Sequence, residues 1–555
     1  MTCPRRSGVR VKHCRSLLIF TATACALPAD RDPGDTVMWE LPSESPTRSQ
    51  DPELPRVLID TRYVPPTGAM RTVRAGENLQ AALDAARPGD VILLEAGASF
   101  VGNFTLPAKL GSAWIVIRSS TADANLPPEG TRVTPSFSAA LPKLVSPNTN
   151  AVLRTASGAH HYRLIGVEMT VASSVTENYG IVLLGSGAHK SLDQVPHHII
   201  LDRVYVHGHA TLNLKSCVAL NSATSAVIDS YLAECHGKGF DSQAIGGWNG
   251  PGPFKIVNNY LEGAGENLMF GGGDPSIPNL TPSDIEIRRN HFTRPVSWKG
   301  VWTVKNLFEL KHAQRVLVEG NLFENHWADA QAGSAVVWKS VNQNGTAPWS
   351  VVRDVTFRRN RLRNVGGGIA LAARPEEHPA VPASRVTIVD NVLDNVNVGA
   401  FTGHGALFTV GGGPADVTIE HNTALHAGPA HSALAMDIVP PQMARFVFRN
   451  NVVTRGQHGV FGSGAGEGAN ALTFYAAPGF KFERNVLIGP DNGAVYPANN
   501  SFPATIDAVG FVNVPAGNYR LAAGSPYKKA RSDGRDPGAD IEAVEGATQG
   551  VAAPR

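Results

Sequence analysis

The sequence predicts an all-β solenoid, a chain whose short strands stack in parallel from one coil to the next. The first observation is the composition: the 555 residues include 56 Gly and 39 Pro but only 17% charged residues, whereas long helices need more Lys, Glu, Arg and Leu. The second is a repeated pattern of an alternating apolar strand, an asparagine and a second short apolar pair. The third is its period of roughly 30 residues, because units this short cannot each bury a hydrophobic face alone.

The asparagine of the repeat predicts a bend between strands. Successive asparagines are 31, 31, 39, 31, 31, 29 and 34 residues apart, at Asn259, Asn290, Asn321, Asn360, Asn391, Asn422, Asn451 and Asn485. Two earlier units carry Arg203 and Ser230 in this place. At a sharp bend an asparagine tolerates a left-handed backbone, and its amide can bond the same residue one coil above and below. We therefore expect an internal ladder of asparagine side chains.

Residues 1–26 have the layout of an export signal. Five basic residues and no acid precede an apolar run at 16–27, which is too short to span a bilayer. Small residues at 22, 24 and 26 allow cleavage after residue 24 or 26, whereas cleavage just before Cys25 would leave a lipid anchor. We expect a secreted, periplasmic or cell-surface protein exported by a bacterial signal, with no membrane span.

The charge balance and the cysteines exclude several classes. The formal net charge of +2 falls to −3 once the five basic residues of 1–26 are removed, and no run of like charge follows. Nucleic acid and membrane surfaces are therefore not expected partners. Three of the five cysteines also lie in that segment, which leaves Cys217 and Cys235. These two either form one disulfide or remain buried thiols.

The predicted domain begins near Arg71. Residues 27–70 are rich in Pro, Ser, Asp and Glu and are interpreted as a linker or poorly ordered lead-in. The next segment reads RTVRAGENLQAALDAARPGDVILLEAG, in which apolar residues recur at helical spacing before a Pro-Gly stop and an apolar strand. We expect an amphipathic helical cap, a solenoid over 71–541 and a disordered tail over 542–555.

These features resemble the right-handed parallel β-helix proteins of the pectate-lyase-like superfamily. The resemblance covers about residues 71–541, and the closing NYRLAAGSPYKKARSDGRDPGADI is similar to the end of many such proteins. It implies three strands per coil, with the asparagine bend between the second and third, and substrates lying along the first strand. The superfamily includes polysaccharide lyases, glycoside hydrolases, esterases, epimerases and phage tailspikes, so the fold does not fix the reaction.

The predicted first strand at 306–312 carries the most informative charges. If Phe308 and Leu310 point inward, Glu309 and Lys311 lie together on the outer face, exposed to solvent. The neighbouring coils add Asp241, Glu266, Asp274, Lys339 and Arg374. An ordinary solvated ion pair explains Glu309 and Lys311 without any reaction. Because charge is scarce in this chain, the cluster nevertheless indicates a site.

The cluster suits β-elimination from a uronic acid. In that reaction a cation or Ca²⁺ neutralises the substrate carboxylate, and a basic side chain removes the C5 proton. The segment FELKHAQRVLVEGNLF is similar to the basic strand of alginate and chondroitin-type β-helix lyases, where an Arg followed by a His stands at this place. The predicted base is Lys311 with His312 as its backup, Arg374 and Lys339 are the predicted neutralisers, and Glu266, Glu309 and Asp241 are predicted Ca²⁺ ligands. No organic cofactor is expected.

Two other functions remain open. Glycoside hydrolysis needs two carboxylates about 5–5.5 Å or about 6.5–9.5 Å apart. Asp241, Glu266 and Glu309 on consecutive coils can meet either spacing, although the paired-aspartate motif of polygalacturonase-like hydrolases is absent. The second alternative is a non-catalytic glycan-binding or adhesive surface solenoid.

Aromatic residues between the repeats favour a carbohydrate groove near the middle of the solenoid. Sugar faces stack on such rings, and loop packing is the alternative explanation. The predicted substrate-binding residues are Trp248, Trp298, Trp302, Trp327 and Asp274. A polysaccharide is therefore the expected partner. His207 and His209 have alternate spacing but no evident third ligand, so a structural role is favoured for them.

Overall fold

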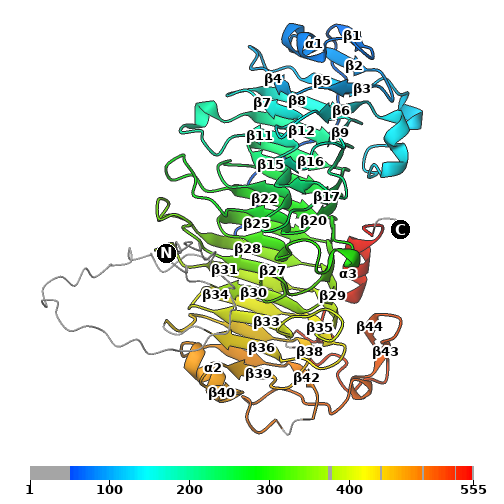
Figure 1. The fold of residues 1–555 in the computed structure, drawn as a ribbon. Helices are drawn as coiled ribbons and strands as arrows, with labels where there is room; N and C mark the ends of the chain where they lie inside the picture. The colour runs from blue at the N-terminus through cyan, green and yellow to red at the C-terminus, as the bar shows by residue number, and fades with distance from the viewer. Residues whose placement is uncertain (1–50, 373–377, 438–440, 491–492, 532, 553–555) are drawn as a thin grey trace, which may run out of the picture.

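The computed structural model describes residues 51–552 apart from 373–377, 438–440, 491–492 and 532. The predicted export signal, Cys25, the first part of the predicted linker and Arg374 lie outside the described residues. Within them the chain forms one elongated stack of coils (Figure 1). No helix of the described part is long and apolar enough to cross a lipid bilayer.

Each coil contributes one strand to each of three long sheets, here called sheets C, A and B in the order in which the chain visits them. Sheet C contains β4 (Phe104–Leu106), β7 (Leu153–Thr155), β11 (Val182–Gly185), β15 (Ser216–Asn221), β18 (Gln243–Gly247), β21 (Glu266–Phe270), β24 (Asn306–Leu310), β27 (Ser334–Lys339), β30 (Gly367–Ala372), β33 (Ala406–Gly411), β36 (Ser432–Asp437), β39 (Val460–Gly462) and β40 (Gly466–Glu467). Only β40 runs antiparallel to its neighbour in this sheet.

Sheets A and B complete the coils. Sheet A contains β1 (Met70–Val73), β2 (Val91–Leu94), β5 (Ile115–Ser119), β8 (His160–Ile165), β12 (His197–Asp202), β16 (Ala223–Ile228), β19 (Phe254–Val257), β22 (Ser283–Arg288), β25 (Ala313–Glu319), β28 (Val352–Arg358), β31 (Ser384–Val389), β34 (Ala415–Glu420), β37 (Val447–Arg449) and β41 (Lys481–Glu483). Sheet B contains β3 (Ser99–Val101), β6 (Lys143–Ser146), β9 (Glu168–Val171), β13 (Tyr205–His207), β17 (Tyr231–Cys235), β20 (Tyr260–Gly263), β23 (His291–Thr293), β26 (Leu322–His326), β29 (Arg361–Val365), β32 (Val392–Val396), β35 (Thr423–His426), β38 (Val452–Thr454) and β42 (Val486–Ile488).

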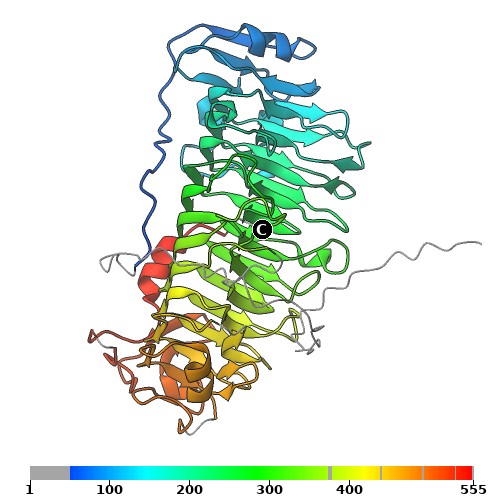
Figure 2. The same cartoon turned by 90° about the vertical axis from the view of Figure 1, so that its left-hand side faces the viewer.

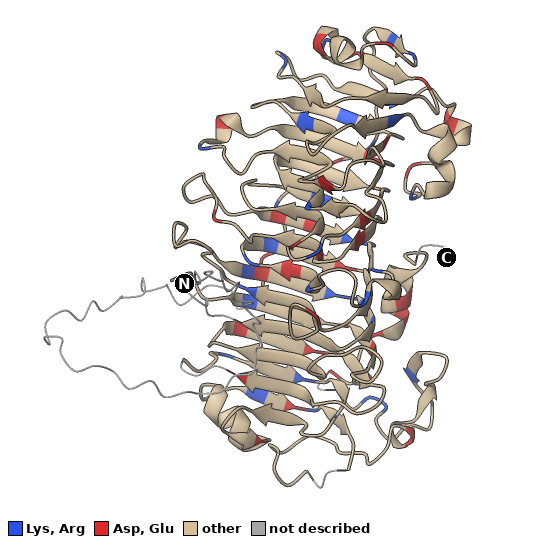
Figure 3. Ribbon diagram, viewed as in Figure 1, with Lys and Arg blue, Asp and Glu red and all other residues tan. Residues whose placement is uncertain are grey.

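This is the right-handed parallel β-helix that the repeat and the resemblance predict. Apolar residues stack in register inside the coils, as in the sheet A column of Val316, Val355, Val386 and Val417, each 0% exposed. The remaining strands form two short pairs, β10 (Glu177–Asn178) with β14 (Asn213–Leu214) and β43 (Phe511–Asn513) with β44 (Asn518–Leu521). Lys and Arg residues are interspersed with Asp and Glu residues along the ribbon of the coils (Figure 3).

The asparagines lie at the bend between sheets A and B and bond from coil to coil. Asn290 accepts at Oδ1 from both the backbone and the side-chain N–H of Asn259, and its own Nδ2 donates to Oδ1 of Asn321 at 3.0 Å. The same pattern continues through Asn485 to Asn500. These bonds satisfy backbone groups that the bend takes out of the sheets.

One part of the predicted bend is wrong. The asparagines themselves do not have a positive φ; the residue before each one does, as at Asn258 with φ 58° and Gly320 with φ 66°. Arg203 also has φ 52°, and the backbone N–H of Val204 donates to Ser230 Oγ. The position equivalent to the asparagine is therefore Val204, one residue after the one predicted.

Both ends of the solenoid are covered. Helix α1 (Leu79–Ala85) buries Leu79, Ala82 and Leu83 over the first coils, as predicted for the cap, and Asn78 accepts a hydrogen bond from the backbone of Ala81. At the far end, α2 (Ala469–Tyr475) buries Leu472 and Tyr475. The prediction of a disordered tail is wrong for most of its length, because α3 (Ile541–Thr548) packs Ile541 and Val544 against Tyr519 and Leu521.

Residues 51–69 are also better ordered than the predicted linker. They have no regular secondary structure but run down the outer face of sheet A (Figure 2). Arg56 donates its backbone N–H to Asp284, and Lys255 donates to the carbonyl of Ile59. The segment makes these contacts through the side chains of the sheet rather than by pairing as a strand, and its prolines lack the N–H that pairing would need.

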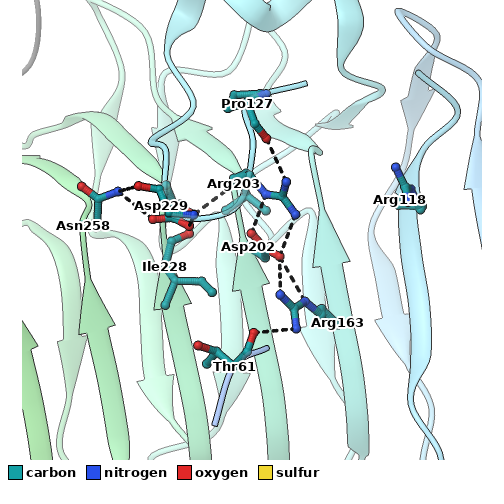
Figure 4. Close-up of polar contacts among 12 residues, drawn as sticks. Thr61, Arg118, Pro127, Arg163, Asp202, Arg203, Ile228, Asp229 and Asn258 are labelled. Carbon is teal, nitrogen blue, oxygen red and sulfur yellow. Dashed lines mark hydrogen bonds and ion pairs between the residues drawn. The ribbon is translucent and has the colours of Figure 1, made fainter. Parts of the chain in front are cut away.

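A buried ion cluster anchors the same segment near Thr61. Asp202 lies between two guanidinium groups: Arg163 donates to it at 2.6 Å and Arg203 at 2.7 Å (Figure 4). Arg163 also donates to the carbonyl of Thr61. One coil later, Cys217 on β15 and Cys235 on β17 form a disulfide, which settles the alternatives left open by the sequence.

Candidate functional site

The charged residues predicted from the sequence gather on the outer face of sheet C, at β18, β21 and β24. We call Asp241, Glu266, Lys305, Glu309 and Lys311 the acidic–lysine cluster. Phe308 and Leu310 point into the core, as predicted. Glu266 pairs in register with Asn306, and Met269 pairs with Glu309, so the two glutamates are on neighbouring coils and three positions apart along the strands. Asp241 lies just before β18.

The cluster is far more buried than predicted. Glu266 and Glu309 are 0% exposed and Lys311 is 7% exposed, so the expected solvated ion pair is wrong. The turn after β21 lies directly over Lys311: a Cβ on Gly271 would come within 2.7 Å of the Lys311 Cβ. Only Asp241 and Lys305 reach solvent appreciably, with side chains 29% and 20% exposed.

The carboxylates are unequally partnered. Asp241 forms an ion pair with Lys305 at 2.5 Å, and Gln243 donates to Glu266 Oε2 at 2.8 Å. The other oxygen of Glu266 and both oxygens of Glu309 are buried without a hydrogen bond. The Lys311 ammonium nitrogen lies 3.6 Å from Glu309 Oε2, which is too long for a hydrogen bond. Buried polar atoms of this kind are uncommon in proteins and often mark sites of chemistry or of bound water and ions.

Burial and neighbouring charge shift the proton affinities in opposite directions. Burial, with the charges of Glu309 and Asp241, raises the pKa of Glu266 to about 7. Burial alone would raise the pKa of Asp241, but Lys305 outweighs it and holds that pKa below its usual value. Burial would likewise lower the pKa of Lys311, but the carboxylates of Glu309, Glu266 and Asp241 outweigh it, so the pKa of Lys311 is raised.

The raised pKa of Glu266 predicts a pH-dependent stability. The folded state holds this proton more tightly than the unfolded state, so the stabilisation is complete below the ordinary pKa of 4.5 and is lost as the pH rises through about 7. From this group we expect the free energy of unfolding to fall by at most about 3 kcal/mol over that window. Urea unfolding of the wild type and of Glu266→Gln at several pH values isolates the effect, because the other titrating groups are common to both. If the free energy of unfolding changed with pH equally in the wild type and in Glu266→Gln, this prediction would be contradicted.

Of the other predicted catalytic residues, His312 is already engaged, and Lys339 lies on the next coil beside Lys311. His312 is buried; its Nε2 donates to the carbonyl of Leu280 and its Nδ1 accepts from the backbone of Val351, so its predicted role as the backup base is wrong. Lys339 ends β27, directly after Trp338, which pairs with Leu310 next to Lys311. Arg374 lies outside the described residues.

The predicted substrate-binding residues are mainly packing residues. Trp298 and Trp327 are buried with Val304, so the predicted sugar platforms are wrong for these two, whereas Trp302 is half-buried and stacks on His236 with ring centroids 3.8 Å apart. Asp274 accepts three backbone hydrogen bonds from residues 343, 344 and 346 and thereby fixes a loop. Trp248 is half-buried between the turns at Gly187 and Gly273.

Comparisons with known proteins do not identify a reaction. No protein-family model matches the chain, and no curated protein matches it. Among solved structures, an alginate lyase from Paenibacillus sp. str. FPU-7 is 14% identical, with a TM-score of 0.30 over 75% of this chain and 99% of that chain. A mannuronic acid specific polysaccharide family 6 lyase from human gut microbiota is 13% identical, with a TM-score of 0.49 over 77% and 88%. The A-module of an Azotobacter vinelandii mannuronan C-5 epimerase is 12% identical, with a TM-score of 0.47 over 74% and 95%.

Two residues of the site were missed by sequence reasoning. Lys305 stands just before β24, two coils after Asp241, and its ammonium group balances the charge of that carboxylate. Arg294 is completely buried and donates to Asn267 Oδ1 and to the carbonyl of Asn306. Burial lowers the pKa of Arg294 to about 9, and the charge of Glu266 opposes that shift. The sequence contained a signal for Lys305: it directly precedes the aligned strand at 306–310, and a charge at that position lies beside the charges of neighbouring coils.

The predicted calcium ligands do not fit the ion well. Ca²⁺ takes roughly six to eight oxygen ligands. Asp241 is instead paired with Lys305, and Lys311 lies beside Glu309, so ammonium groups stand where a cation would be needed. Among the described residues, Asp241, Glu266 and Glu309 are also not a set of three ligands within 4.8 Å of one another.

Proposed function

We propose that this protein is an exported carbohydrate-active enzyme that cleaves a uronic-acid-containing polysaccharide by β-elimination at the acidic–lysine cluster. The observation that carries the proposal is Glu266, a buried carboxyl group with a free oxygen, a pKa of about 7 and charge coupling to two lysines. Such a group can both accept and release a proton near neutral pH. The disulfide supports export, because disulfides persist in oxidising compartments.

The structure supports a different base from the one predicted. A base must be unprotonated, and the raised pKa of Lys311 keeps this side chain charged at neutral pH. As a buried ammonium group it suits the carboxylate of a uronic acid, whose charge must be neutralised before the C5 hydrogen becomes acidic. Glu266 is then the proton acceptor.

The electron and proton changes balance within the cluster. The C5 proton of the uronate moves to the Glu266 carboxylate, the released electron pair forms the C4–C5 double bond, and the C4–O bond breaks. The leaving oxygen takes a proton from a lysine ammonium of the cluster. Asp241 and Lys305 are the members that reach solvent, so a substrate meets them first, and its carboxylate competes with Asp241 for Lys305.

Glycoside hydrolysis is the second candidate, favoured by one observation. The pKa of Glu266 is raised and that of Asp241 is lowered, and two carboxyl groups with separated pKa values are what an acid and its ionised partner require. The two reactions predict opposite pH dependence. A lyase needs ionised Glu266, so its rate rises as the pH passes about 7, whereas a hydrolase needs protonated Glu266 and loses rate there.

The test combines product chemistry with one substitution. The mature protein is incubated with alginate, pectate, chondroitin and heparin-like glycans, and both the ultraviolet absorbance of unsaturated ends and the number of reducing ends are measured. We expect absorbance, and a loss of about 100-fold or more in Lys311→Met, which keeps an apolar stem beside the turn at Gly271 and Gly272. The control is Lys481→Met, an exposed lysine on β41.

Each alternative has its own result. Reducing ends without absorbance, with a rate that falls above pH 7, would replace the lyase by the hydrolase. Retention on a glycan affinity gel with neither product would leave a binding solenoid and overturn the enzymatic proposal. An unchanged rate in Lys311→Met would remove that lysine from the reaction.

A further inference from the structure

Two pairs of consecutive histidines lie one above the other on sheet A, away from the acidic–lysine cluster. His160 and His161 begin β8, and His197 and His198 begin β12. His160 pairs in register with His197, so the two pairs are on adjacent coils. All four side chains are half-buried and therefore within reach of solvent.

The four rings form a tight array. His160 stacks on His197 with ring centroids 4.8 Å apart, and His161 stacks on His198 at 4.5 Å. Within each pair the Nδ1 atoms approach closely, to 2.8 Å and 2.7 Å. A nitrogen–nitrogen contact this short is a hydrogen bond only if one ring donates and the other accepts. At least one nitrogen of each pair therefore carries a lone pair.

The backbone holds the array in place. His161 and His198 have φ 60° and 54°, a left-handed conformation that is unusual for histidine. It turns consecutive side chains toward each other instead of to opposite faces of the strand. Trp114 flanks both residues, with ring centroids 5.3 Å and 6.4 Å away. The same positive φ recurs at the equivalent position of later coils, as at Thr224 and Asp284, so the solenoid itself supplies this conformation.

We propose that His161, His197 and His198 bind a divalent transition-metal ion. One ring nitrogen from each lies within 4.8 Å of the other two, and within the described residues this is the group of three potential ligands that meets this distance. Zn–N distances are about 2.0–2.1 Å, so small ring rotations bring three such nitrogens onto one ion. A set of three imidazoles suits Zn²⁺, Cu²⁺ or Ni²⁺ rather than Ca²⁺ or Mg²⁺.

The ion would cross-link two adjacent coils. His161 comes from one coil and His197 and His198 come from the next, so the metal would join β8 to β12 outside the hydrogen bonds of sheet A. His160 touches His161 through Nδ1 and thereby orients that ligand. An ion bound only by the folded state stabilises it by mass action.

The test measures Zn²⁺ binding to the full chain after removal of metal by a chelator. Calorimetry should show one Zn²⁺ per chain, and a thermal unfolding scan should show a higher Tm with Zn²⁺. In His161→Asn and His198→Asn, affinity should fall at least 10-fold and the Tm increase should be lost. Asparagine is chosen because it accepts the left-handed backbone at both positions. His209→Ala, which lies just after β13 of sheet B and outside the histidine array, is the control and should bind like the wild type.

A spectroscopic signature separates ligation from packing. Cu²⁺ bound to the wild type should show nitrogen hyperfine splitting from three imidazoles in its electron paramagnetic resonance spectrum, and from fewer in His198→Asn. Absence of stoichiometric binding would overturn the proposal and leave a stack of histidines that only packs. So would equal Zn²⁺ affinity in His161→Asn, His198→Asn and the wild type.

Discussion

Replacing Glu266 by glutamine should lower the rate of glycan cleavage by about 10²–10⁴-fold at neutral pH, the usual effect of removing a general acid or base. Glutamine has the same shape and can still accept the hydrogen bond that Gln243 donates to Oε2. It cannot take up the C5 proton of a uronate or protonate a glycosidic oxygen. The loss should appear in kcat with either product assay, because both candidate reactions use this carboxyl group.

The matched control is Glu286→Gln. Glu286 is also a buried carboxylate on a strand, 6% exposed, but it lies on sheet A and pairs with Arg288. Its replacement should leave the rate within about twofold of the wild type. If Glu266→Gln retains full activity while far-ultraviolet circular dichroism shows an intact fold, the acidic–lysine cluster is a structural feature and the active site lies elsewhere.

The fold could be predicted because every coil buries its apolar strands against the next coil in the same way. The spacing of the asparagines gave the period, and alternation placed Phe308 and Leu310 inside and Glu309 outside. Stacking in register then brought Asp241, Glu266 and Glu309 onto neighbouring coils, as expected. Arg203 was assigned one residue early because Val204 has no polar side chain to mark the bend.

Burial at the site could not be predicted, because it depends on loops whose path the repeat does not encode. The turn at Gly271 lies against Lys311 and helps to enclose it, whereas the carboxylates of Glu309, Glu266 and Asp241 keep the lysine charged. Trp298 and Trp327 are buried in a separate cluster with Ala264 and Val304, and the sequence alone could not distinguish them from exposed sugar platforms. The predicted positions of these residues along the strands are therefore correct, but their burial by loops changes the roles that we propose for them.

The histidine pairs were missed for a different reason. Strict alternation places neighbouring residues on opposite faces of a strand, so His160 and His161 were not expected to meet. The left-handed residue at the start of β8 breaks that rule. The signal that could have found the array is the recurrence of a His-His dipeptide at the same position of two consecutive coils.

The asparagine ladder should be a major source of stability, and Asn321→Ala tests it near the centre. Asn321 Oδ1 accepts from the backbone and side chain of Asn290, and its Nδ2 donates to Ile287 and Asn360. Alanine removes all four bonds and leaves buried donors and acceptors without partners, and each such group costs about 1–3 kcal/mol. We expect the free energy of unfolding to fall by about 3–5 kcal/mol in urea titrations, because some groups find water. Asn344→Ala, in an exposed loop, should change it by less than about 0.5 kcal/mol; equal effects of the two substitutions would show that the ladder does not stabilise the bends.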